Sequence, residues 1–328
     1  MPSASEALRA RFSLTLELVP RHAREERFRG GWAGFRMAGW HIGVIGGSGL
    51  YDPGELEDDL QQIAVGSAFG EPSSPVTMGR IGPVKFSFIA RHGEDHRLSP
   101  SHVNYRANID ALKRCGVTDV LAISAIGSLR EELAPGGFVA VDQFIDRTLG
   151  RERSFFGNGI VAHVGLADPV CPRLAKFAAA AAKAAGAEVR RGGTYVAIEG
   201  PQFSTRAESL LYREWGADVI GMTAMPEARL AREAELPYAL LGMVTDYDAW
   251  RETEAGVEAS EILGVMRANA ETARRTLAEL AKALPEERAP SPIDRALDTA
   301  LITPRGAWRG ETAARLDAVM RRLLNENS

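Results

Sequence analysis

Short apolar runs, each followed directly by glycine or small polar residues, recur along the chain from residue 41 onward. The first run, His41–Ile45, is followed at once by a Gly-Gly-Ser-Gly segment at 46–49. Further strand-like runs lie at 84–90, 120–124, 138–141, 193–198, 219–222 and 238–244. Strands separated by helical patterns are typical of an α/β domain with a mixed or parallel sheet. Open sheets of this kind bind ligands at the carboxyl ends of their strands, so the residues after each run are the candidates for function.

Helical patterns occupy several of the intervals between these runs. They lie at 104–115, 172–185, 204–215, 226–235 and 258–283. The alanine-rich stretch 172–185 begins at a proline and ends before Gly186, as a helix start and stop should. We therefore expect one α/β domain over residues 41–285.

The two ends of the chain differ from this central part. Residues 1–40 carry seven arginines and four glutamates, and we expect a basic, disordered extension. An Arg-rich transit peptide is the alternative, but the glutamates argue against it, and Met37 is a candidate for the functional start. A proline-rich stretch at 285–292 predicts a linker, and the helical spacing beyond it predicts a Pro-linked helical C-terminal tail over residues 286–328.

Composition excludes several classes of function. The net charge of −4 gives no basic footprint, so nucleic acid is not an expected partner. No apolar run reaches the roughly 18 residues of a membrane helix, so no membrane partner is expected. The two cysteines, Cys115 and Cys171, cannot make a disulfide framework, which predicts a reducing, cytoplasmic location.

Two segments combine the features of an anion site. In the loop at 46–49, glycines allow close approach of backbone N–H groups and Ser48 adds a hydroxyl donor. A dinucleotide fingerprint would need glycine or alanine at Asp52, so a compact phosphate loop is favoured over a nicotinamide cofactor site. After the apolar run 84–90, Arg91 offers a planar fork that suits phosphate oxygens, and His92 adds one more hydrogen bond.

Histidines cluster after the same run, which raises the question of a metal. His92, His96 and His102 would suit metal ligands only on a helix, and Gly93 and Pro100 favour a loop. We therefore predict no metal site. The alternative readings of all these short segments, taken singly, are ordinary turns and loops.

Three later strand ends carry small, aromatic or soft side chains. The segment 123–128 is built of small residues that leave room for a ligand. Phe203 could stack on a flat ring and Ser204 could hydrogen-bond to it. Met222 lies beside the hydroxyl donor Thr223, although methionine in a strand is more often a core residue.

The last strand end, 244–250, places Asp246 and Asp248 on either side of Tyr247. A carboxyl group at a partly buried strand end has its pKa raised by desolvation and by a neighbour of like charge. A raised pKa suits a general acid near neutral pH. An ordinary acidic loop is the simpler alternative for the motif alone.

Taken together and in order, these segments resemble the trimeric purine nucleoside phosphorylase superfamily. The match covers about three quarters of the chain and runs through residues 42–52, 90–93, 101–108, 127–132, 142–148, 198–204, 221–227 and 245–248. It is most similar to the branch that cleaves S-methyl-5′-thioadenosine. The fold that the resemblance implies is a single domain with a twisted mixed β-sheet flanked by helices.

The resemblance also implies roles for individual residues. Phosphate would be held by Ser48, Arg91, His92, Ser124, Ala125 and Thr223. The nucleoside would be bound by Phe203, Ser204, Met222, Asp246, Tyr247 and Asp248, with Met222 under the ribose and Asp248 towards the 6-amino group. The 5′-substituent pocket would include His96, Val257, Ala259, Ile262 and Leu263, together with His163 from a neighbouring subunit of a homotrimer or a dimer of trimers.

The reaction implied is phosphorolysis of S-methyl-5′-thioadenosine to adenine and 5-methylthioribose 1-phosphate, a step of purine and methionine salvage. Asp246 would be catalytic and protonate purine N7 while phosphate attacks the anomeric carbon. Neither a metal nor an organic cofactor is expected, because inorganic phosphate is a co-substrate. The alternatives are a phosphorylase for inosine, guanosine or 5′-methylthioinosine and, in a different class, a catalytically idle nucleotide-binding protein.

Overall fold

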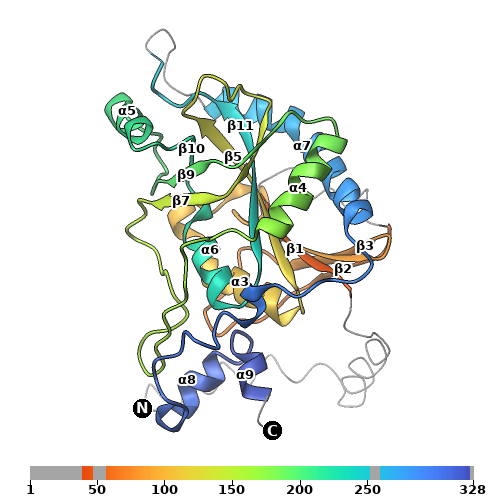
Figure 1. Cartoon of the computed structure of the whole chain (residues 1–328), viewed down its shortest axis with the longest axis vertical. Coiled ribbons are helices and arrows are strands. Elements are labelled where there is room, and N and C mark those ends of the chain that lie inside the picture. The colour runs from red at the N-terminus through yellow and green to blue at the C-terminus, as the bar shows by residue number, and fades with distance from the viewer. Residues whose placement is uncertain (1–38, 47–56, 252–258, 326–328) are drawn as a thin grey trace, which may run out of the picture. The chain divides into compact units, whose positions relative to one another are not determined.

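The computed structural model describes residues 39–46, 57–251 and 259–325. Contacts divide the chain into Met1–Gly39 and Trp40–Ser328, and the second unit carries the fold. Its described residues form an eleven-stranded mixed sheet in which most strands follow the order β2-β3-β4-β1-β5-β10-β9-β7 (Figure 1). The expected twisted mixed sheet flanked by helices is therefore confirmed.

The strands predicted from apolar runs are present with small changes at their ends. They are β1 (His41–Gly46), β4 (Val84–Ala90), β5 (Asp119–Ser128), β6 (Phe138–Val141), β9 (Thr194–Ala197), β10 (Val219–Gly221) and β11 (Tyr238–Asp246). Four further strands were not predicted: β2 (Glu57–Ile63), β3 (Val76–Ile81), β7 (Gln143–Asp146) and β8 (Val189–Arg191).

The long strand β5 is where the sheet divides. Along residues 120–127 it pairs in parallel with β11, and at Gly127 and Ser128 it pairs antiparallel with β10. The pairing with β11 carries an irregularity between Val244 and Asp246. A sheet that splits at a strand end leaves space between the diverging strands, and this space is the natural place for a ligand.

Helices cover both faces of the sheet. On one face α4 (Pro172–Ala184) and α7 (Ala259–Ala283) pack beside each other over β1, β4 and β11. On the other, α3 (Tyr105–Arg114) packs against α6 (Ala224–Glu233) (Figure 1). The remaining long helix, α5 (Arg206–Glu214), begins with a capping box between Thr205 and Glu208.

Residues 286–328 continue the same compact unit. They contain the short 3-10 helices η4 (Pro292–Arg295) and η5 (Arg305–Ala307) and the helices α8 (Gly310–Arg315) and α9 (Arg321–Asn325). Leu297, Leu316, Val319 and Met320 are buried in the cluster that also contains residues of α3 and α6. Of the predicted basic extension, residues 1–38, including Met37, lie outside the described residues, whereas Trp40 is buried in the core of the second unit.

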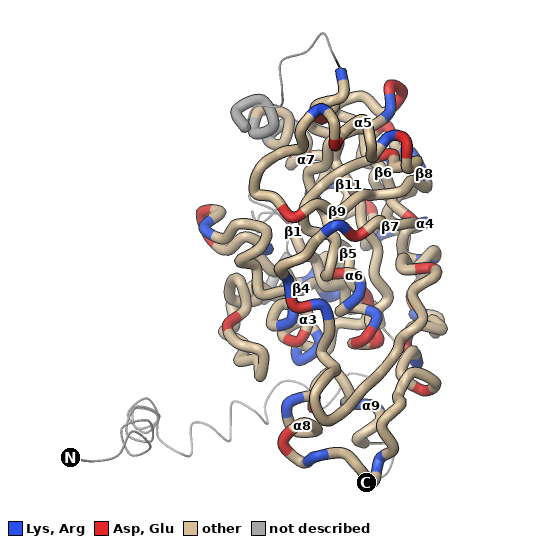
Figure 2. The backbone as a smooth tube through the Cα atoms, turned by 90° about the vertical axis from the view of Figure 1, so that its left-hand side faces the viewer, with Lys and Arg blue, Asp and Glu red and all other residues tan. Residues whose placement is uncertain are grey.

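Lys and Arg positions and Asp and Glu positions are both scattered along the described backbone (Figure 2). Among the helices that the structure describes, none is long and apolar enough to cross a membrane.

Candidate active site

A cavity of about 720 Å³ opens where β5, β10 and β11 diverge. Its walls come from the loop after β4, the middle of β5, the ends of β9, β10 and β11, and helix α7. Segments more than 150 residues apart in the sequence therefore meet around one space. The structure brings together these predicted site residues: Arg91, His92, His96, Ser124, Ala125, Phe203, Met222, Thr223, Asp246 and Asp248.

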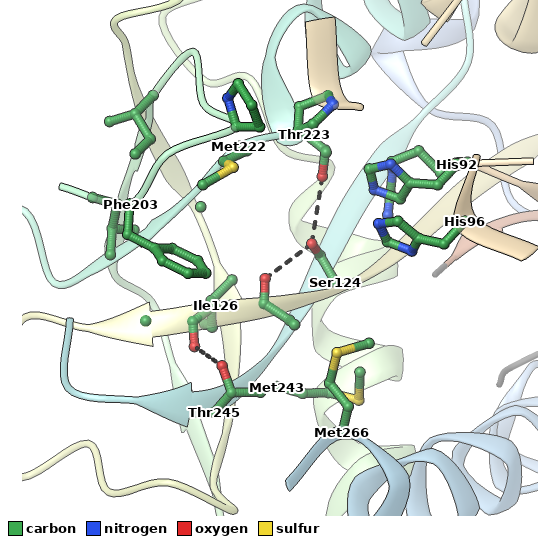
Figure 3. Close-up of a pocket in the computed structure, with 18 of the residues that line it drawn as sticks. His92, His96, Ser124, Ile126, Phe203, Met222, Thr223, Met243, Thr245 and Met266 are labelled. Carbon is green, nitrogen blue, oxygen red and sulfur yellow. Dashed lines mark hydrogen bonds between the residues drawn. The ribbon is translucent and has the colours of Figure 1, made fainter. Parts of the chain in front are cut away.

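Two hydroxyl groups mark one end of this cavity. Ser124 on β5 and Thr223, which caps the start of α6, have their oxygens 3.4 Å apart, and both side chains are buried (Figure 3). Two neighbouring hydroxyls of this kind can both donate hydrogen bonds to an oxyanion.

Arg91 also lines the cavity, and an ion pair with Glu227 holds its guanidinium group. Its guanidinium is almost fully buried, and its Nε–Nη2 edge forms a double ion pair with Glu227 at 2.9 and 3.1 Å. Nη1 donates to the carbonyl of Ile123 at 3.2 Å. The bidentate edge expected to face an anion is thus occupied by Glu227, so an anion in the cavity would be met by the Nη1 side. Sequence reasoning did not assign a role to Glu227, although it lies in the matched segment 221–227.

His92 and His96 form a stacked pair beside the hydroxyls. The two rings are nearly parallel, with centroids 4.1 Å apart (Figure 3). His92 Nδ1 lies 2.8 Å from the carbonyl oxygen of Leu98 and must donate to it, because a carbonyl has no hydrogen to give. Burial, followed by the charge of Arg91, lowers the pKa of His92 to about 4. The ring is therefore neutral near pH 7 and presents Nε2 as an acceptor, which suits the P–OH of a hydrogen phosphate ion.

The end of β11 carries the two predicted aspartates. Asp246 accepts hydrogen bonds at both oxygens, from the backbone N–H of Asp248 at 2.8 Å and from the Thr245 hydroxyl at 2.6 Å. The Thr245 oxygen also lies 3.2 Å from the carbonyl of Ile126. These contacts fix the Asp246 carboxyl group at the edge of the cavity.

Asp248 is the more buried of the two aspartates. It has a φ of 52°, a left-handed conformation that aspartate tolerates better than most residues. Burial, as the largest influence, raises the pKa of Asp248, and the nearby Ser209 hydroxyl partly opposes this. Its Oδ2 and the Ser204 hydroxyl are buried without a hydrogen bond of standard geometry in the described part of the chain. The Ser204 and Ser209 hydroxyls both face this carboxylate, and each lowers its pKa.

Gly127 explains why the β5 end is built of small residues. A Cβ at this position would lie 2.9 Å from Asp246 Oδ1 and 2.9 Å from Ile220 Cγ2. Any larger residue would displace the carboxyl group. The sequence prediction that small side chains leave room here holds, and part of that room is taken by Asp246 itself.

The remaining walls are apolar. Met222 and Phe203 lie on one side, and Met243 of β11 and Met266 of α7 lie on another (Figure 3). Ala270 continues the α7 wall. Sequence reasoning placed the apolar pocket at Val257, Ala259, Ile262 and Leu263; Val257 and the side chains of the other three lie outside the described residues. Met266 and Ala270 follow one and two helical turns later on α7, so helical periodicity could have found them.

Other predicted site residues are placed elsewhere. Ser48 lies outside the described residues. Tyr247 is not among the cavity residues, and its hydroxyl lies 3.4 Å from the carbonyl of Glu131. His163 is exposed and its backbone N–H donates to Ala300, so it is not part of the cavity of its own chain. Among described residues no group of three or more His, Cys, Asp or Glu could hold a metal ion.

Comparison with known proteins agrees with this geometry. The family model of the phosphorylase superfamily matches residues 41–282. The chain belongs to this superfamily, as the resemblance predicted.

Closer relatives define the branch. The S-methyl-5′-thioadenosine phosphorylases of Bradyrhizobium diazoefficiens and Cereibacter sphaeroides are each 54% identical over 86% of this chain and 98% of their own. The crystal structure of a methylthioadenosine phosphorylase from an antarctic soil metagenomic library is 44% identical, covers 86% of this chain and 99% of its own, and has a TM-score of 0.81. Within the superfamily, the chain is therefore a member of the S-methyl-5′-thioadenosine phosphorylase family.

Proposed function

We propose that this protein is a pentosyltransferase that cleaves S-methyl-5′-thioadenosine with inorganic phosphate. The products are adenine and 5-methylthioribose 1-phosphate. One observation carries the proposal: a single cavity joins an anion site, formed by Ser124, Thr223, Arg91 and His92, to a pair of aspartates at the end of β11. A phosphate and a purine bound at these two places would face the two sides of one glycosidic bond.

In the proposed reaction, phosphate attacks the anomeric carbon as the bond to the purine breaks. The bonding electrons move onto the purine, and Asp246 donates a proton to N7, so the base leaves neutral. The Thr245 hydroxyl and the Asp248 N–H hold the Asp246 carboxyl group in place for this transfer.

Asp248 supports the choice of a 6-aminopurine. The Asp248 carboxylate lines the cavity and can accept a hydrogen bond from a 6-amino group, whereas a 6-oxo group offers only an acceptor. The apolar wall of Met243 and Met266 favours a methylthio group over a 5′-hydroxyl, which would find no partner there. A phosphorylase for inosine, guanosine or 5′-methylthioinosine is the alternative.

The proposal needs neither a metal nor an organic cofactor, since phosphate is both nucleophile and counter-charge to the sugar cation. We further propose a homotrimer, alone or as a dimer of trimers, in which His163 completes a neighbour's 5′ pocket. Its support is that His163 is exposed outside its own cavity and that Leu210, Leu211 and Trp215 are exposed on or beside α5. A cytoplasmic location is supported by the two unpaired cysteines.

Substitution of Asp246 tests the assigned chemistry. We expect D246A to lower kcat for S-methyl-5′-thioadenosine by about 100-fold or more, the usual contribution of a general acid. We expect D246N, which can donate to N7 and still face a 6-oxo group, to shift preference towards 5′-methylthioinosine.

Base release is followed by absorbance, with D142N as a matched control. Asp142 is exposed, lies outside the cavity and only accepts a hydrogen bond from Gly193 N–H. Adenine release by D246A at the wild-type rate would refute the role of Asp246 as the acid.

A further inference from the structure

Arg151 lies behind the wall of the cavity rather than in it. Its side chain is only 1% exposed, and it is not among the cavity residues. It follows β7 by five residues and was not among the predicted site residues. A buried guanidinium demands several acceptors, so the identity of those acceptors shows what the residue does.

The acceptors belong to the two segments that form the cavity wall. On one side Nη2 donates to the carbonyl of Glu199 at 2.7 Å. On the other, Nη1 donates to the carbonyl of Met225 at 2.7 Å and to that of Met222. Nη1 also lies 3.1 Å from the Tyr105 hydroxyl. One side chain therefore joins the chain after β9 to the chain after β10.

The sheet topology explains why a side chain is needed to connect the segments after β9 and β10. Strands β9 and β10 pair in parallel up to Ala197 and Gly221, and one more bond runs from Ile198 N–H to the Gly221 carbonyl at 2.9 Å. Beyond it the two segments separate to form the cavity. The backbone carbonyls of the two separated segments no longer pair with each other as strands of a sheet do. Arg151 lies between the segments and donates hydrogen bonds to these carbonyls instead.

Arg151 is itself anchored by Glu199. Nε lies 3.3 Å from Glu199 Oε1, and the other carboxylate oxygen accepts from the backbone N–H groups of Leu149 at 2.6 Å and Gly150 at 3.3 Å. Burial raises the pKa of Glu199, but the hydrogen bonds from Ser101, Leu149 and Gly150 outweigh it and hold the pKa at about 2. The anchor stays charged over the whole range in which the enzyme is assayed.

We propose that Arg151 is a positioning residue for phosphorolysis: it fixes the Met222–Met225 turn against the Glu199 strand end. This holds Thr223 beside Ser124 and keeps Phe203 in the wall of the cavity. The activity measurement for this inference rests on the proposed function. The structural claim, that one guanidinium group holds the two segments together, is tested independently.

The kinetic test compares R151A and R151K with the wild type. We expect R151A to lower kcat/KM for S-methyl-5′-thioadenosine by about 100-fold, the cost of a misplacement of about 1 Å, with a rise in KM for phosphate as Thr223 moves. R151K keeps the positive charge but lacks the planar guanidinium group. We therefore expect it to restore less than a tenth of the kcat/KM that R151A loses. Added methylguanidine should restore part of the activity of R151A.

R229A is the matched control. Arg229 is an α6 arginine that forms an ion pair with Asp146 at 3.1 Å and does not line the cavity. We expect its kcat/KM to stay within twofold of the wild type. A wild-type rate in R151A or full rescue in R151K would overturn the positioning role, because a fork that spans two segments would then be dispensable.

Amide hydrogen exchange separates this inference from the proposed function. R151A, or R151K if the alanine variant does not fold, should exchange at least tenfold faster at residues 198–204 and 221–226, with other regions unchanged. Unchanged exchange in both segments would overturn the inference whatever the substrate is. A wild-type enzyme that releases no adenine would instead refute the proposed function and leave the exchange result standing.

Discussion

The ion pair between Arg91 and Glu227 is the most buried charged contact beside the cavity. Both side chains are 1% exposed, and Glu227 also accepts a hydrogen bond from the Tyr238 hydroxyl at 2.9 Å. An arginine without this partner would leave a buried, uncompensated charge and would be free to turn. Glu227 therefore sets the direction in which Arg91 can meet an anion.

Loss of that carboxylate should weaken phosphate binding selectively. We expect E227Q to raise the KM for phosphate by about 10- to 100-fold, since a charged partner of a buried pair is worth several kcal/mol, and to change the KM for the nucleoside much less. Initial rates at varied phosphate measure the effect. E279Q, at a glutamate on the outer side of α7 paired with Lys282, is the control. An unchanged KM for phosphate would contradict the role given to Glu227.

Sequence alone identified the residues at the strand ends but not the residues behind them. Asp246 and Thr223 lie at the ends of predicted apolar runs, where the rule that ligands bind at strand ends singled them out, whereas Ser124 lies in the middle of β5, which continues to Ser128. Glu227 and Arg151 act through partners 136 and 46 or more residues away, a pairing that no local pattern contains. The roles of the site residues stay predictions until they are tested by substitution.

Among the secondary-structure elements, the most buried strands were predicted from the sequence, and more exposed strands were missed. All six residues of β1 are buried, and a strand covered on both faces appears as a continuous apolar run. Strand β2 has the sequence Glu-Asp-Asp-Leu-Gln-Gln-Ile and lies at the edge of the sheet, where several of its side chains face solvent. An edge strand of this kind carries no hydrophobic pattern, so only the pairing with β3 reveals it.

Helix α6 is tied to the loop before α4 through a titrating carboxyl group. Glu233 is buried and accepts hydrogen bonds from the Ser154 hydroxyl and the Phe155 N–H, both at 2.7 Å. Burial raises its pKa from 4.5 to about 7, although both hydrogen bonds oppose this. Between these two values the folded chain holds a proton that the unfolded chain has released.

This raised pKa predicts how stability depends on pH. The contribution of Glu233 is fully present below about pH 4.5 and is lost as the pH rises to about 7, a difference of about 2 to 3 kcal/mol in the free energy of unfolding. E233Q should remove this dependence. Urea unfolding at pH 5 and pH 8 measures it, and a wild type whose pH dependence equals that of E233Q would contradict the assignment.

For the whole molecule, residues 286–328 are held to the rest of the unit by charge as well as by apolar packing. Asp119, fully buried at the start of β5, pairs with both Arg173 and Arg288. The Trp40 indole N–H donates to the carbonyl of Pro285 at 2.9 Å. The proline-rich composition predicted a linker but could not show these anchors, because the partners lie far away in the sequence. The division into three parts stays a prediction.

The packing of this C-terminal segment should be visible in stability. Met320 is fully buried in the cluster with α3 and α6, so M320A should cost about 2 to 5 kcal/mol. I302A, in the same segment at a side chain that is 61% exposed, should change stability by less than about 0.5 kcal/mol. Thermal or urea unfolding compares the two. Equal, small effects would mean that the segment does not contribute to the core in solution.

The central claim is that one cavity joins a phosphate to a 6-aminopurine nucleoside. Its most direct test is base release by the purified protein, as adenine from S-methyl-5′-thioadenosine and adenosine and as hypoxanthine from 5′-methylthioinosine, each with and without phosphate. We predict release from S-methyl-5′-thioadenosine at the highest kcat/KM, strictly dependent on phosphate and matched by one equivalent of 5-methylthioribose 1-phosphate. Base release that persists without phosphate, or a preference for 5′-methylthioinosine, would contradict the account.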